Sequence, residues 1–112
     1  MFSITNAKGF QVRFKNGLIL STQFGAMNYC DNRSLSSFTV VPENLGCKNA
    51  EVAIWDESGE WKTKEMLQKA FAQNDHSDDV IGYITMDTWP KIVAWCENYK
   101  CEIENKNTKL LK

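Results

Sequence analysis

The chain has 112 residues, a hydrophobic fraction of 43% and a net charge of −1. We expect one soluble globular domain over residues 1–112, with 103–112 as a frayed tail. The near-neutral charge excludes binding to a polyanion through bulk charge, so nucleic acid is not a favoured partner. No apolar run approaches the length of a membrane span and no secretion leader is visible, which predicts a cytoplasmic protein without a membrane partner.

A strand at residues 2–5 opens the chain, and a β-hairpin follows it. Apolar and polar residues alternate through 10–15 and again through 18–24, which predicts two strands that each have one apolar face. A two-residue turn at 16–17 would scramble these faces. A three-residue loop at 15–17 keeps the apolar faces together, so we prefer it.

The three-residue loop also fixes the register of the hairpin. With Gly17 in a left-handed conformation, Phe14 pairs with Leu18 and Phe10 pairs with Thr22. The other face of the two strands then carries the polar side chains of Gln11, Arg13, Ser21 and Gln23. That polar face is either solvated or a binding surface.

A long connection is expected between the third and fourth strands. Residues 25–50 show no sustained period and are rich in Gly, Asn and Ser, with room for one short strand at 37–41. Long loops in compact domains are usually functional or disordered. The aromatic side chains of Tyr29 and Phe38 within it favour a loop that is packed on the sheet.

The fourth strand ends at Trp55 and is expected to return through a tight turn to Trp61. If Gly59 is left-handed in that turn, the two tryptophans face each other across the strands. The same register sets Asp56 against Glu60. Two like charges in this arrangement are tolerated only where water or a cation screens them.

Two helices and one more strand complete the expected fold. Apolar residues at helical spacing predict a helix over about 63–73, capped by Thr63, and a C-terminal helix over about 87–99 with Pro90 in its first turn. A short strand is expected at 80–85. The fold class is therefore α+β: a mainly antiparallel sheet of five to six strands with a C-terminal helix and, at most, one further helix packed on it.

One loop concentrates the polar groups that could bind a ligand. Asn28, Tyr29, Cys30, Asp31, Asn32 and Arg33 bring two amides, a carboxylate, a phenol, a thiol and a guanidinium into six positions. Tyr29 could stack on a small ligand or on a partner, and Arg33 could donate two hydrogen bonds. The alternative is a self-satisfied loop in which the Asn and Asp side chains bond to nearby backbone groups.

The middle of the chain offers a second candidate contact because it is acidic. Residues 51–89 hold three basic and nine acidic side chains, a net charge of −6, and Asp56, Glu57 and Glu60 lie in its tight turn. A solvated acidic face is the simpler explanation. The candidate binding residues are Gln23, Asn28, Tyr29, Asp31, Asn32, Arg33, Asp56, Glu57 and Glu60.

No persuasive catalytic or metal-binding set is visible. Cys30 would need His76, the only histidine, as its base, and nothing in the sequence brings the two together. The cysteine spacings do not match structural zinc sites, and the cluster at 75–79 lacks the rest of a calcium loop. We therefore expect no catalytic residue, no metal and no cofactor, and free thiols as the default state of the cysteines.

A longer pattern gives the chain a family context. The pattern Gly-Phe-x3-Phe-x-Asn-Gly-x3-Ser-x-Gln-Phe-Gly-x2-Asn-Tyr-Cys runs from Gly9 to Cys30 and resembles small uncharacterised proteins of phages and prophages. The resemblance covers most of residues 9–99. It implies a non-enzymatic protein in the cytoplasm of the host cell that inhibits a bacterial defence system, in the manner of an anti-CRISPR protein. Its partner would be a host defence protein or the nucleotide signal of a defence system.

Three alternatives stay open. The protein could be a sponge that sequesters a nucleotide signal. It could be a small enzyme acting on a nucleotide or nucleic acid, with Cys30 or the acidic cluster at 75–79 as reactive groups. It could also be a structural protein of a phage particle, and in that case we expect a symmetric homo-oligomer formed through exposed strand edges.

Overall fold

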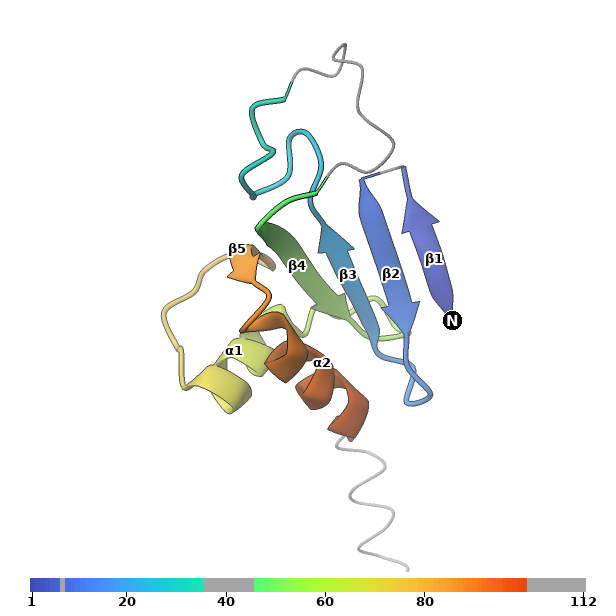
Figure 1. Cartoon of the computed structure of the whole chain (residues 1–112). Coiled ribbons are helices and arrows are strands. Elements are labelled where there is room, and N and C mark those ends of the chain that lie inside the picture. Colours follow the sequence, from blue (N-terminus) through green and yellow to red (C-terminus); the bar gives the residue numbers. More distant parts are fainter. Residues whose placement is uncertain (7, 36–45, 101–112) are drawn as a thin grey trace, which may run out of the picture.

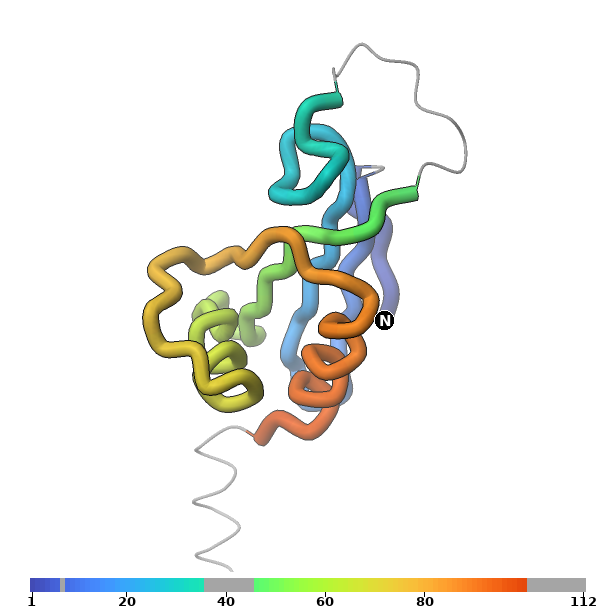
Figure 2. The backbone as a smooth tube through the Cα atoms, turned by 60° about the vertical axis from the view of Figure 1, so that its left-hand side comes forward, coloured from blue at the N-terminus to red at the C-terminus, as the bar shows by residue number. Residues whose placement is uncertain are grey.

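The computed structural model describes residues 1–6, 8–35 and 46–100. Within them, five strands form one antiparallel sheet in the order β1-β2-β3-β4-β5 (Figure 1). The strands are β1 Phe2–Thr5, β2 Gly9–Arg13, β3 Ile19–Gln23, β4 Asn49–Trp55 and β5 Val80–Thr85. Two helices, α1 Thr63–Phe71 and α2 Trp89–Asn98, lie on the same side of the sheet (Figure 2). The predicted α+β class is confirmed.

The hairpin of β2 and β3 has the predicted register. Phe10 pairs with Thr22, and the Phe14 N–H donates to the Leu18 carbonyl at 2.9 Å. Gly17 closes the three-residue loop with φ of +88°, a left-handed conformation that glycine adopts without steric cost. The alternation of apolar residues therefore determines the pairing of these strands.

The hairpin loop also holds the end of α2. The Asn16 Nδ2 donates to the carbonyl of Cys96 at 2.8 Å and to that of Tyr99 at 3.0 Å, while its Oδ1 accepts from the Leu18 N–H at 3.0 Å. The last carbonyls of a helix have no partner inside the helix, so a side chain that reaches them stabilises the helix end. Asn16 thus joins the N-terminal sheet to the C-terminal helix.

The helices cover the apolar face of the sheet. The buried cluster between them consists of Leu18, Leu20, Val52, Ile54, Met66, Leu67, Ile84, Ile92 and Cys96. Residues of the opposite face alternate with these along each strand, and neither described helix packs on that face. Ser21 and Gln23 are nevertheless buried there, and the Gln23 amide donates to the Ser21 hydroxyl at 3.2 Å. The polar face is thus only partly solvated.

The tight turn after β4 is as predicted. Trp55 and Trp61 form a bridge across the strands, with ring centroids 5.5 Å apart in an edge-to-face arrangement. Gly59 is left-handed, and the Asp56 N–H donates to the Glu60 carbonyl at 3.0 Å. The aromatic pair therefore closes the turn that leads into α1.

Thr63 does not cap α1, so that prediction is wrong. It is the first residue of the helix, and its buried hydroxyl accepts a hydrogen bond from the Ile54 N–H at 2.9 Å. The reason lies in the sheet: β5 pairs with β4 only as far as Ala53, so the next main-chain groups of β4 need other partners. The Lys62 N–H and the Thr63 hydroxyl supply them.

The boundaries of the helices differ slightly from the predicted ones. Two other predicted segments lie outside the residues that the structure describes. α1 ends at Phe71, and α2 begins at Trp89 with Pro90 in its first turn, as expected. The predicted strand at 37–41 and the predicted tail at 103–112 lie outside the described residues. Both therefore stay predictions.

Replacing Thr63 with valine keeps the shape of the side chain and removes its hydroxyl. We expect Thr63→Val to lower the free energy of unfolding by about 1–3 kcal/mol, because the Ile54 N–H is left buried without its partner. Thr63→Ser keeps the hydroxyl and should cost about 0.8 kcal/mol, the value of one buried methyl group. Urea denaturation measures both, and a Thr63→Val protein as stable as the wild type would contradict the role assigned to the hydroxyl.

Candidate functional site

Residues 24–35, here called the docked loop, are anchored to β4 and β5 at one end of the sheet (Figure 1). Both main-chain polar groups of Tyr29 make the connection. Its N–H donates to Oε2 of Glu51 in β4 at 2.7 Å, and its carbonyl accepts from the N–H of Tyr83 in β5 at 2.9 Å. The centre of the loop is therefore held against the sheet.

A glycine makes this close approach possible. A Cβ on Gly82 would overlap the Cβ of Tyr29 and lie 2.8 Å from the Tyr29 carbonyl oxygen. The pairing of β4 with β5 shifts register between Ala50 and Val52, next to this contact. Such an irregularity locally redirects a strand, and here it creates the place where the docked loop contacts the sheet.

Two predicted site residues point inward and fix the loop. The Asn28 Oδ1 accepts from the Gly25 N–H at 3.1 Å, and the Asn32 Nδ2 donates to the carbonyls of Phe24 at 2.7 Å and Gly46 at 3.2 Å. These bonds match the self-satisfied alternative, in which short polar side chains satisfy the backbone of a loop. Asn28 Oδ1 and Asn32 Nδ2 therefore help to build the loop.

The phenol and the guanidinium lie on the outside of the same loop. The Arg33 guanidinium carbon lies 4.2 Å from the centre of the Tyr29 ring, a cation–π contact, and its Nη1 donates to the Met27 carbonyl at 3.0 Å. Met27 is 68% exposed, Tyr29 41% and Tyr83 52%. These four residues, Met27, Tyr29, Arg33 and Tyr83, are called the tyrosine surface below.

An open cavity of about 510 Å³ lies within this surface. Its lining consists of Met27, Cys30, Asp31, Arg33, Ser34 and Tyr83. Asp31 is exposed at the cavity, while its N–H is held by Oδ1 of Asn49 at 2.8 Å. The cavity therefore combines apolar and aromatic walls with one charge of each sign.

Two residues of the tyrosine surface have strained backbones. Met27 has φ of +70° and Tyr83 has φ of +58°, in the left-handed region that costs a bulky residue on the order of 1–3 kcal/mol. The other non-glycine residues with positive φ in the described ranges are Asn6 and Ala72, in a turn and at a helix end. Strain of this kind is concentrated at functional sites, where the surrounding structure enforces it.

The predicted acidic residues lie at the other end of β4, far from the tyrosine surface. Asp56 lies five positions after Glu51 along extended chain, which corresponds to roughly 17 Å. Glu57 is paired with Arg13 at 2.6 Å, and Glu60 lies 3.6 Å from the amino group of Lys62. The structure therefore does not bring the two predicted sets together.

Asp56 and Gln23 are engaged within the protein. The Asp56 carboxylate accepts from the hydroxyl of Ser58 at 2.6 Å and from its N–H at 2.9 Å, and the hydroxyl bond lowers the pKa of this carboxyl group. Gln23 is buried and bonded to Ser21. The Asp56 carboxylate and the Gln23 amide therefore both make hydrogen bonds within the protein.

The residues considered for catalysis are also held by other contacts. Cys30 is buried, its thiol donates to the Gly25 carbonyl at 3.6 Å, and burial raises the pKa of the thiol, which disfavours the nucleophilic thiolate. His76 has its Nε2 2.7 Å from the Val80 carbonyl at the start of β5. Within residues 1–6, 8–35 and 46–100, no three His, Cys, Asp or Glu side chains gather as a metal would require.

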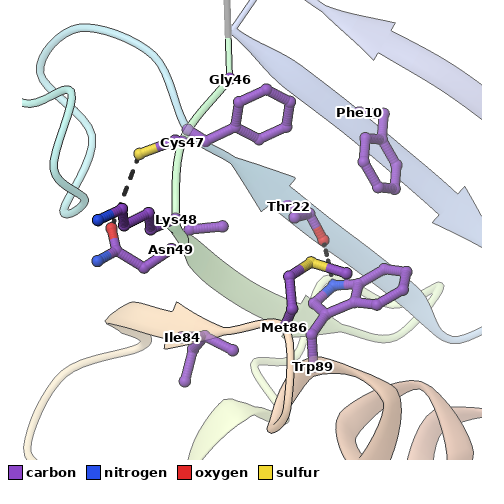
Figure 3. A pocket seen from close by; sticks show the side chains of 11 residues that line it. Phe10, Thr22, Gly46, Cys47, Lys48, Asn49, Ile84, Met86 and Trp89 are labelled. Carbon is purple, nitrogen blue, oxygen red and sulfur yellow. Dashed lines mark hydrogen bonds between the residues drawn. The ribbon is translucent and has the colours of Figure 1, made fainter.

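A second, more apolar pocket of about 320 Å³ lies beside α2 (Figure 3). The rings of Phe10 and Trp89 meet edge to face with centroids 6.2 Å apart, and the Trp89 Nε1 donates to the Thr22 hydroxyl at 3.0 Å. In the figure Met86 lies beside Trp89, and Lys48 lies on the far side of the pocket. The pocket thus offers apolar walls without a converging set of polar groups, so it is the weaker candidate.

Comparison of the chain with protein-family models, curated proteins and solved structures gives no significant match. Neither described helix has the length and apolar character that crossing a membrane requires.

Replacing Gly82 with alanine tests whether the docked loop depends on this close approach. We expect Gly82→Ala to lower the free energy of unfolding by about 1–3 kcal/mol, because the new methyl group overlaps Tyr29. Gly46→Ala is the matched control, since a Cβ there meets nothing within 4 Å. Urea denaturation measures the stabilities and amide chemical shifts report the loop. Equal stability and unchanged shifts at Tyr29 and Tyr83 in both variants would contradict the prediction.

Proposed function

We propose that this protein is a non-enzymatic, phage-type binding protein that inhibits a bacterial immune protein, and that the tyrosine surface makes the contact. The observation that carries the proposal is the exposure of Met27, Arg33 and Tyr83 around one open cavity, with the exposed Tyr29 ring against the Arg33 guanidinium. Tyr, Arg and Met are enriched where protein interfaces are buried, and Tyr and Arg dominate the binding energy. A surface of this composition suits a protein partner.

The rigidity of the surface supports the same proposal. Tyr29 is fixed by Glu51 and Tyr83, and Arg33 is fixed by its contacts with Tyr29 and with the Met27 carbonyl. Side chains that are already ordered lose little conformational entropy on binding. Such preorganisation raises affinity without any additional contact area.

The chemistry of the cavity indicates what a partner would insert. The Tyr83 ring and the Met27 side chain supply apolar walls, and Arg33 supplies a donor that suits a carboxylate or a main-chain carbonyl. An apolar side chain beside an acceptor group is therefore the expected contact. The resemblance to phage proteins supports a host defence protein as the source of that contact.

The proposal predicts that replacing both Arg33 and Tyr83 with alanine abolishes inhibition. The test uses a set of bacterial strains that each carry one defence system. The wild-type protein should restore phage plating on the strain whose defence system it inhibits. We expect the double variant Arg33→Ala/Tyr83→Ala to lose this effect and to bind the purified target at least about 100-fold more weakly, since each residue has hot-spot character. Plating efficiency and titration calorimetry measure the two effects.

Arg13→Ala is the matched control because Arg13 is also an exposed arginine, in an ion pair outside the tyrosine surface. It should inhibit like the wild type, since exposed ion pairs contribute little. Circular dichroism checks that the double variant is folded. A folded double variant that still inhibits would contradict the proposal, and so would a bound nucleotide in the native mass spectrum without any protein partner.

A further inference from the structure

Within residues 1–6, 8–35 and 46–100, the first strand leaves one edge of the sheet open. Among these residues β1 is hydrogen-bonded to β2 alone, and its four residues, Phe2 to Thr5, carry no charge and no proline. Phe2 is 80% exposed and Ile4 is 86% exposed. Natural edge strands normally carry a charge, a proline or a bulge that prevents pairing with another chain, and β1 has none of these within its pairing with β2.

The register shows which main-chain groups point to this open edge. The N-terminal amino group of Met1 donates to the Arg13 carbonyl at 2.9 Å, and the Arg13 N–H donates to the Met1 carbonyl at 2.8 Å. In an antiparallel pair, alternate residues bond to the same neighbour. Because Met1 bonds to β2, the N–H and carbonyl groups of Phe2 and Ile4 point away from β2.

The opposite edge of the sheet is protected. The register of β5 against β4 is irregular, Tyr83 is left-handed, and the N–H of Tyr83 is bonded to the carbonyl of Tyr29. An irregular strand that already contacts a loop is a poor template for another strand. Among the described strands, β1 is therefore the one with a regular and uncovered edge.

We propose that a second copy of this chain pairs with β1, so that two sheets join into one antiparallel sheet of ten strands. A two-fold axis beside Ser3 sets Phe2 of one copy opposite Ile4 of the other. In this register the outward N–H and carbonyl groups of Phe2 and Ile4 satisfy one another in both copies. The sequence Phe-Ser-Ile-Thr is complementary to itself in this arrangement. The strand that pairs with β1 is therefore β1 of the second copy.

The side chains support the same pairing. Phe2 is in register with Val12 and Ile4 with Phe10, on the face that carries the helices, but the helices do not cover β1 (Figure 1). An aromatic ring opposite a β-branched side chain is a favourable cross-strand pair. The dimer contains two such pairs, which cover apolar surface that a single copy exposes to water.

The dimer leaves the tyrosine surface free, since Tyr83 lies in β5 at the other edge of the sheet. Each dimer would then present two tyrosine surfaces, and a partner with two copies of its epitope would be bound more tightly. The pairing buries one short strand edge from each copy, so the buried area is small for a specific protein–protein interface. We therefore expect a concentration-dependent dimer rather than a permanent one.

Sedimentation analysis from about 5 µM to about 1 mM protein tests the proposal. We expect the wild type to shift from monomer to dimer over this range and Ile4→Lys to stay a monomer, because a charge on an edge strand opposes pairing. Phe2→Glu is a second variant with the same expected result. Met86→Lys is the matched control, since Met86 is also apolar and 70% exposed but lies outside β1, and it should dimerise like the wild type.

Amide hydrogen exchange identifies the edge that pairs. The amides of Phe2 and Ile4 should become protected as the protein concentration rises, and those of Ile4→Lys should not. A wild type that stays monomeric at about 1 mM would overturn the proposal, as would a folded Ile4→Lys protein that dimerises normally. Because these measurements use no target protein, they are independent of the test of the proposed function.

Discussion

Tyr29 joins the docked loop to the sheet through both of its main-chain polar groups, and Gly82 leaves the space for this contact. A methyl group at position 82 would push the loop away from β5, and the hydrogen bond between Tyr29 and Tyr83 would then lengthen beyond its usual range. The aromatic ring of Tyr29 would then lose its fixed position, and with it the support for Arg33. The geometry of the tyrosine surface therefore follows from a backbone contact.

The tyrosine surface combines strained backbone conformations with exposed apolar side chains. Met27 and Tyr83 hold left-handed conformations that destabilise the folded state, and Met27, Tyr29 and Tyr83 leave apolar area in water. A loop with a purely structural role requires neither feature. Asn28 and Asn32 show what a structural role looks like, since their side chains bond to neighbouring backbone groups. The docked loop thus divides into residues that build it and residues that it presents.

Much of the fold could be predicted from the sequence because local patterns determine it. Alternation of apolar residues and a glycine suited to positive φ were sufficient for the hairpin around Gly17. The contact of Thr63 with Ile54 could not be predicted, since it depends on where β5 stops pairing with β4. The loop was recognised as a candidate from its composition, but Tyr83 was missed. Tyr83 is left-handed beside the register shift of β5 and the contact with Tyr29, and a tyrosine in the sequence gives no indication of a positive φ.

Amide hydrogen exchange at Tyr29 and Tyr83 tests the central claim most directly. Both N–H groups lie outside regular strand pairing, and each has one acceptor, the Glu51 carboxylate and the Tyr29 carbonyl respectively. The account predicts that both amides exchange only through the unfolding that also opens β4 and β5. Exchange of the two amides at the rate of an unstructured loop, while the amides of β4 stay protected, would contradict it.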